Sequence, residues 1–147
     1  MKRLFTLSAV LVLALSFAAF GAVQDFGRFT LDVPEGWTGT FQAPSAIITK
    51  NDNTAQLVVT ISGTEGASLG DIAAGVAEAF KQQGFTNLTE PTADSDGDYS
   101  FEGVNPQGAK SHVLITGADD EFCMFTMTGL ETAADEIQAI IGSLAEK

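Results

Sequence analysis

The chain has 147 residues, of which 45% are hydrophobic, and this is enough for one domain with a single core. Its 7 Lys and Arg residues against 19 Asp and Glu residues give a formal net charge of −12, a sign that repels phosphate backbones and anionic lipid headgroups. The composition therefore disfavours nucleic-acid binding and charge-driven binding to a membrane surface, whereas a basic partner or a cation is electrostatically suitable.

The first residues have the pattern of a secretory signal peptide. A basic pair, Lys2-Arg3, precedes an uncharged apolar run over residues 4–20, and small residues stand at Ala19 and Gly21. We expect cleavage after Gly21, with Ala22 as the less favoured site. A signal anchor is the alternative, although the apolar run is short for a hydrocarbon core of about 30 Å.

Cleavage divides the chain into a signal peptide, residues 1–21, and a mature domain, residues 22–147, which begins with a few linker residues. There is no Cys at the cleavage region to accept a lipid. We therefore expect a soluble protein that is periplasmic or secreted and that does not insert into the membrane after cleavage.

The first half of the mature chain has the alternation of β-strands. Apolar and polar residues alternate over residues 29–33, a turn follows at Pro34-Glu35-Gly36, and an extended piece covers residues 37–41. Two further strands, residues 46–49 and 56–61, flank a turn rich in Asn and Asp, which predicts a hairpin.

A helix is predicted over residues 69–83, because its apolar residues recur at spacings of three and four. Ser68 is a suitable N-cap and Gly84 a suitable stop. A short strand over residues 85–89 is also expected, before the pattern breaks at residues 90–97.

Three strands in succession are predicted next, over residues 98–104, 109–116 and 121–128, joined by tight turns as a meander. The last of them has apolar residues on both faces, which indicates a central strand covered on both sides. We expect Thr116 to face Glu121 across the second turn. After Gly129, an apolar stripe predicts a terminal helix over residues 130–144, followed by a frayed acidic end.

The candidate metal site is the acidic turn Asp94-Ser95-Asp96-Gly97-Asp98, in which Asp94, Asp96 and Asp98 supply carboxylate oxygens. The turn does not match an EF-hand loop, because its Gly is at the fourth position and the final Glu is missing. A looser calcium site or small-ligand site and an ordinary polar turn are the two remaining interpretations.

Catalysis is not expected. The single His, His112, leaves zinc improbable, and the single Cys, Cys123, cannot form an intrachain disulfide. The expected register makes His112 and Cys123 diagonal neighbours on one face, so that a Cys-His dyad is sterically conceivable. An inert thiol is the favoured interpretation, because Cys123 is expected to be buried among aromatic and Met side chains.

A strand, the sequence Pro34-Glu35-Gly36-Trp37, a hairpin, a long helix, a meander and a terminal helix together resemble the PsbP-like superfamily. That superfamily includes an extrinsic photosystem II protein, a eukaryotic Ran-binding import factor and bacterial envelope proteins of the DcrB type. The resemblance implies an α+β fold, an α/β/α sandwich around a central antiparallel sheet in one domain. It also implies a binding or accessory protein with no cofactor, and the DcrB type fits an exported chain best.

Two functions follow from these expectations. The first is an exported, non-enzymatic periplasmic accessory protein that binds another envelope protein through a sheet edge or a loop-lined cleft. The second is a weak binder of calcium or of a small ligand at Asp94 to Asp98.

Overall fold

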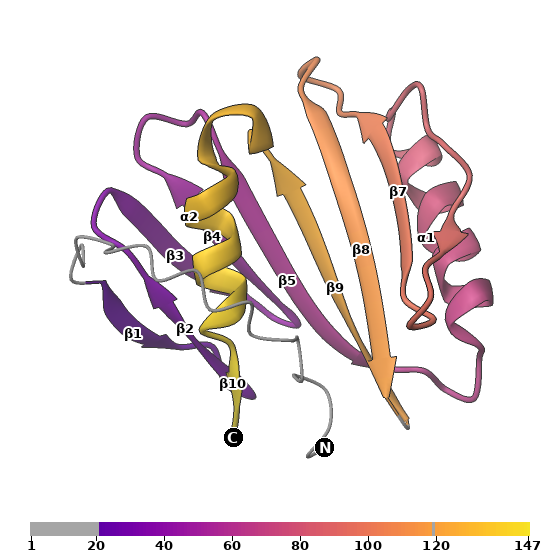
Figure 1. The fold of residues 1–147 in the computed structure, drawn as a ribbon, viewed down its shortest axis with the longest axis horizontal. Coiled ribbons are helices and arrows are strands. Elements are labelled where there is room, and N and C mark those ends of the chain that lie inside the picture. The colour runs from indigo at the N-terminus through magenta and orange to yellow at the C-terminus, as the bar shows by residue number, and fades with distance from the viewer. Residues whose placement is uncertain (1–20, 119) are drawn as a thin grey trace.

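The computed structural model describes residues 21–118 and 120–147, which form a large sheet, a small sheet and two helices (Figure 1). The expected signal peptide, residues 1–21, lies outside the described residues except for Gly21. Among the described residues, no helix combines the length and the apolar character that crossing a membrane requires. The elements in chain order are β1 (Ala22–Asp25), β2 (Phe29–Val33), β3 (Trp37–Gln42), β4 (Ser45–Lys50), β5 (Gln56–Gly63), α1 (Leu69–Gln82), β6 (Thr92–Ala93), β7 (Tyr99–Val104), β8 (Lys110–Ala118), β9 (Glu121–Thr128), α2 (Leu130–Gly142) and β10 (Ala145–Glu146).

The large sheet has seven antiparallel strands in the order β3-β4-β5-β9-β8-β7-β6. Its two halves are the hairpins β3–β4–β5 and the meander β7–β8–β9, and they are joined where β5 pairs with β9 from Gln56 opposite Thr128 to Gly63 opposite Glu121. Strand β9 therefore lies at the centre of the sheet, as its two apolar faces predicted.

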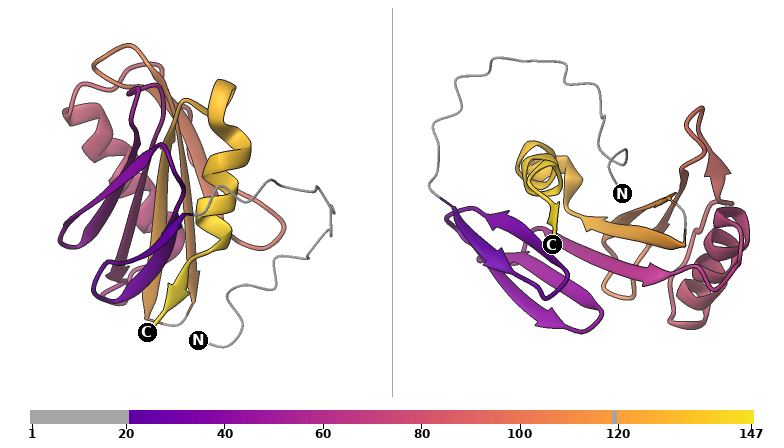
Figure 2. Two further views of the ribbon diagram at one scale, coloured as in Figure 1. Left: turned by 90° about the vertical axis from the view of Figure 1, so that its left-hand side faces the viewer. Right: turned by 90° about the horizontal axis from the view of Figure 1, so that it is seen from below.

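The two helices cover opposite faces of this sheet (Figure 2). On one face, α1 packs on β7 and β8, and Phe122 and Met124 of β9 lie against that core. On the other face, Cys123 and Phe125 of β9 belong to a larger core that includes Ile137 and Ile140 of α2 and the inner face of the small sheet β1-β2-β10. The predicted α+β sandwich, with a helix on either side of the sheet, is confirmed, although α1 lies over β7 and β8 and leaves its side of β9 only partly covered.

Helix α1 begins at the predicted cap, Ser68, and helix α2 begins after Gly129. At α1, the Ser68 hydroxyl accepts a hydrogen bond from the Asp71 N–H at 3.1 Å, which satisfies one of the free donors of the first turn. At α2 the cap is Gly129, in a left-handed conformation with φ of 83°. A Cβ at this position would lie 2.2 Å from the Thr54 carbonyl oxygen, so only glycine allows α2 to start this close to the turn before β5.

The β8–β9 register differs from the expectation. Ala118 lies opposite Glu121 and Thr116 opposite Cys123, so the expected pairing of Thr116 with Glu121 is wrong by two residues. Strand β8 continues to Ala118, which shortens the connection to residues 119–120. A shift of two residues keeps every side chain on its face, and for this reason the prediction of a two-faced strand survives the error.

Residues 85–89 do not form a strand. Only Thr86 pairs, as an isolated bridge with Val104, because Asn87 has a φ of 51° that interrupts the extended conformation. Conversely, three strands were not predicted. The expected linker contains β1, the expected frayed end contains β10, and β6 follows a proline that was interpreted as a break.

The buried stripe of α2 allows a test of the fold. Ile137 is 0% exposed, so Ile137→Asp places a carboxylate in the larger core and is expected to reduce the free energy of unfolding by at least about 3 kcal/mol. The measurement is the urea midpoint by circular dichroism. Gln138→Asp adds the same charge at the next, exposed position and should change the midpoint little. Equal losses in the two variants would contradict the assigned face of α2.

Candidate interaction surface

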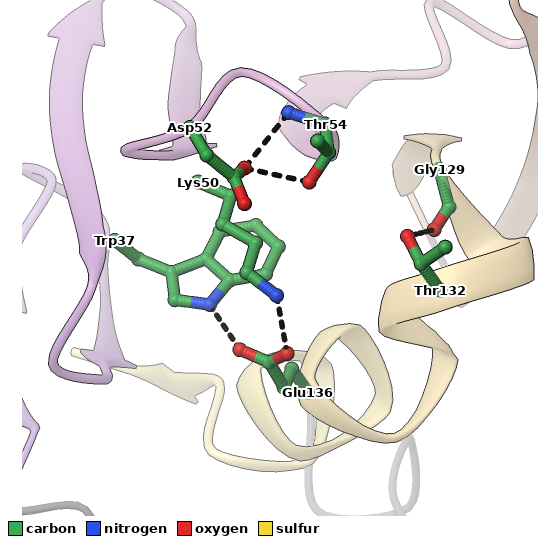
Figure 3. Close-up of polar contacts among 7 residues, drawn as sticks. All are labelled: Trp37, Lys50, Asp52, Thr54, Gly129, Thr132 and Glu136. Carbon is green, nitrogen blue, oxygen red and sulfur yellow. Dashed lines mark hydrogen bonds and ion pairs between the residues drawn. The ribbon is translucent and has the colours of Figure 1, made fainter.

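Trp37, the last residue of the Pro-Glu-Gly-Trp turn, fixes strand β3 to helix α2. It is 6% exposed, and its indole Nε1–H donates to Glu136 Oε2 at 2.5 Å. Lys50, opposite Trp37 on β4, donates to Glu136 Oε1 at 2.8 Å, and its ammonium lies 5.9 Å from the centre of the Trp37 ring. Figure 3 shows both side chains reaching the same carboxylate.

The charges of this cluster stabilise one another. The hydrogen bond from Lys50, and then that from Trp37, lower the pKa of Glu136, and the hydrogen bond to Glu136 raises the pKa of Lys50. All three groups are engaged within the chain. The cluster therefore has a structural role, which is to hold β3 against α2. The Pro34-Glu35-Gly36-Trp37 turn contributes to the fold through its tryptophan.

Strand β3, positioned in this way, is one edge of the large sheet. The Lys50 N–H donates to the Ala55 carbonyl, on the β5 side of β4. Because the backbone N–H and C=O groups of successive residues point to opposite sides of a strand, those of Lys50, Ile48 and Ala46 point toward β5, and those of the residues between them point toward β3. By the register of β3 with β4, Thr38, Thr40 and Gln42 bond inward. The N–H and C=O groups of Gly39 and Phe41 therefore point outward, and no hydrogen bond from them to any other described residue is found.

This edge lacks two of the features that usually protect one, a charged side chain and a proline. Its six residues include no charged side chain and no proline, and the Phe41 side chain is 48% exposed. The opposite edge, β6, is only two residues long and runs into the acidic turn. In the small sheet, β10 is also two residues long and β1 ends at Asp25, which forms an ion pair with Lys147. Among the described strands, β3 is thus the long, uncharged, open edge.

A cleft of about 400 Å³ lies between the small sheet and the centre of the large sheet, and its walls are Gly27, Arg28, Ile61, Glu121, Glu146 and Lys147. Its two cationic side chains are already paired, Arg28 with Glu121 and Lys147 with Asp25. With two positive and two negative side chains, the lining of the cleft has no net side-chain charge that would select an ionic ligand. Of the two expected surfaces, the sheet edge is therefore better defined than the cleft.

Cys123 and His112 do not form a dyad. They lie opposite Thr116 and Met127 in the β8–β9 ladder, four positions or about 13 Å apart along the sheet, so the expected diagonal contact is wrong. His112 Nδ1 lies instead 3.0 Å from Glu102. Burial of Cys123, with a smaller effect of Glu146, raises the pKa of its thiol to about 12. The thiolate that nucleophilic catalysis requires is therefore strongly disfavoured.

The acidic turn bonds to itself. Asp94 Oδ1 accepts hydrogen bonds from the N–H groups of Asp96 at 2.8 Å and Asp98 at 3.0 Å. These bonds stabilise the turn and explain the aspartate at position 94 without a bound metal. Burial, followed by the charges of Asp94 and Asp96, raises the pKa of Asp98. In the described part of the chain, no three His, Cys, Asp or Glu side chains are grouped so that they could hold a metal ion. Calcium binding at Asp94, Asp96 and Asp98 stays a prediction.

Comparison with known proteins bears on the fold. A solution structure of cyanobacterial PsbP (CyanoP) from Synechocystis sp. PCC 6803 matches with a TM-score of 0.55 and 16% sequence identity, over 88% of this chain and 94% of that one. The chain has a PsbP-like fold. At this identity the likeness concerns the fold alone, and membership of the DcrB type stays a prediction. No family model and no curated protein matches the chain.

A crystal structure from Bacteroides thetaiotaomicron matches less closely, with a TM-score of 0.48 and 17% identity, over 88% of this chain and 48% of that one.

The ion pair and hydrogen bond of Glu136 predict that the stability of the protein depends on pH. Because the pKa of Glu136 is lowered in the folded state, its charge stabilises the protein above the unfolded pKa of about 4.3, and this contribution disappears as the pH falls through the folded pKa. Glu136→Gln retains an oxygen for the Trp37 indole but loses the charge. The wild type should have the higher urea midpoint at pH 7, and the difference should close below about pH 4. A difference that does not vary with pH would contradict the role of the charge.

Proposed function

We propose that the chain is an exported, non-enzymatic accessory protein of the cell envelope that binds another envelope protein through the open edge of β3. The observation that carries the proposal is the pair of outward residues Gly39 and Phe41, whose backbone groups have no hydrogen-bond partner among the described residues. An edge of this kind accepts an extended segment of another protein as an additional strand.

The order of the elements supports export. The first described strand, β1, begins at Ala22, so a cut after Gly21 would remove no helix or strand of the described fold. The PsbP-like fold and the raised pKa of the Cys123 thiol both favour binding over catalysis. Among the relatives that the sequence resembles, the bacterial envelope proteins of the DcrB type fit this description best.

The backbone of β3 cannot supply the whole affinity. Gly39 and Phe41 present one donor and one acceptor each, and a hydrogen bond exchanged with water contributes about 1 kcal/mol net. Association costs at least about 4 kcal/mol in lost translational and rotational freedom. Side chains of the added segment must therefore contribute, and the half-exposed ring of Phe41 is the apolar surface available to them at this edge.

Site-specific photocrosslinking tests the proposal. A benzoylphenylalanine at Thr40, an exposed residue of β3, should give a discrete adduct with one envelope protein when the full chain is expressed in its host and irradiated. The same amino acid at Glu78, on the exposed face of α1, should give none. If the chain is exported and cleaved after Gly21, the uncrosslinked chain recovered from the envelope should have the mass of residues 22–147.

Phe41→Pro provides the sharper variant, because it removes the outward N–H donor while the bonds from β3 to β4 remain. It should abolish the Thr40 adduct without a large change in the urea midpoint. Phe41→Leu retains the donor and an apolar side chain, and should retain most of the adduct. The absence of a specific adduct at Thr40, or equal adducts at Thr40 and Glu78, would contradict the proposed function.

A further inference from the structure

We infer that the segment received by β3 belongs to a basic partner, with uncharged residues alongside Gly39 and Phe41 and a Lys or Arg at the end that passes Glu35 and Asp52. This inference rests on the proposed function and specifies the chemistry of the partner at the same surface.

The mature domain has many more acidic than basic side chains. Residues 22–147 contain 5 basic and 19 acidic side chains. Four of the five basic side chains, Arg28, Lys50, Lys110 and Lys147, form ion pairs with carboxylates of the same domain. The unneutralised surface is consequently negative almost throughout. A segment that approaches any of its edges is attracted if it is positive and repelled if it is negative.

The carboxylates nearest to β3 lie at one end of the strand. At the Trp37 end of the edge, two exposed turns meet, because the Asn51 N–H bonds to the Gly36 carbonyl at 2.8 Å and the Thr38 hydroxyl donates to Asn51 Oδ1 at 2.7 Å. Glu35 lies in one of these turns and Asp52 in the other, and both are exposed. The neighbouring Lys50 offsets Asp52 only in part: its ammonium is bound to Glu136, and its charge is one of the smaller causes, after the hydrogen bonds from Thr54, that lower the pKa of Asp52.

The rest of the edge is neutral, so the two ends of β3 differ in charge. Strand β3 contains no charged residue, and the turn that ends it, Ala43-Pro44, contains none either. A partner strand therefore meets hydroxyl groups, a glycine backbone and the Phe41 ring along β3, and carboxylates only at the Trp37 end. A second copy of this chain fits less well: paired antiparallel about a two-fold axis, it would place its own Glu35 and Asp52 at the neutral Gln42 end and would bring no positive charge to the carboxylates at the Trp37 end.

The Thr40 photocrosslinker also tests this inference. The paired variant Glu35→Gln with Asp52→Asn removes two negative charges while both amides retain an oxygen acceptor, including the Asp52 oxygen that holds Thr54. In envelope fractions at about 0.05 M salt, it should reduce the adduct yield about fivefold, and the difference should nearly vanish at about 0.5 M salt. The control pair Glu78→Gln with Glu90→Gln removes the same charge from exposed positions on α1 and in the loop that follows it, and should leave the yield unchanged.

The outcomes separate the two proposals. An adduct whose yield falls only in the Glu35 and Asp52 variant, with a partner segment that is uncharged at the crosslinked position and carries a basic residue several positions along, supports the inference. An adduct that is insensitive to both charge variants, or one with twice the mass of the chain, overturns the inference and leaves partner binding at β3 standing. The absence of any adduct at Thr40 contradicts the proposed function and the inference together.

Discussion

The structure depends on strand β9, which carries apolar side chains on both faces and needs cover on each. A strand with Phe122 and Met124 on one side and Cys123 and Phe125 on the other is stable only if each face is covered. On one side the core between α1 and strands β7 and β8 covers Phe122 and Met124 in part, and on the other side α2 with the small sheet buries Cys123 and Phe125. This requirement sets the layer order and places β9 at the centre of the sheet. It also explains the inert thiol, because Cys123 lies within the larger core.

A central strand implies that the sheet must end somewhere, and the two ends differ. The end at β6 is short and continues into an acidic turn, whereas the end at β3 is six residues long, uncharged and held firmly by the Trp37, Lys50 and Glu136 cluster. A rigid edge suits binding, because a partner strand does not have to pay for ordering it. The tryptophan of the Pro-Glu-Gly-Trp turn would thus contribute to the proposed binding only indirectly, by positioning β3.

Sequence reasoning succeeded where burial alone decides the outcome. The periodicities at residues 69–83 and 130–144 located the helices, and the two-faced strand located the sheet centre. It failed where long-range pairing decides, since the strands at Ala22 and Ala145 exist only because both pair with β2. The same distinction holds for the candidate sites. The acidic turn at Asp94 is recognisable as a local motif, whereas the outward direction of the Gly39 and Phe41 backbone groups depends on which strand lies beside β3. The lack of charge from Trp37 to Gln42 was the one trace of that edge in the sequence.

Amide hydrogen exchange on the free mature protein, measured residue by residue by NMR, tests the open edge most directly. The account predicts slow exchange at Thr38, Thr40 and Gln42, whose N–H groups face β4, and fast exchange at Gly39 and Phe41 between them. Slow exchange at Gly39 and Phe41 in the free protein would mean that the edge is already paired, and would contradict the account.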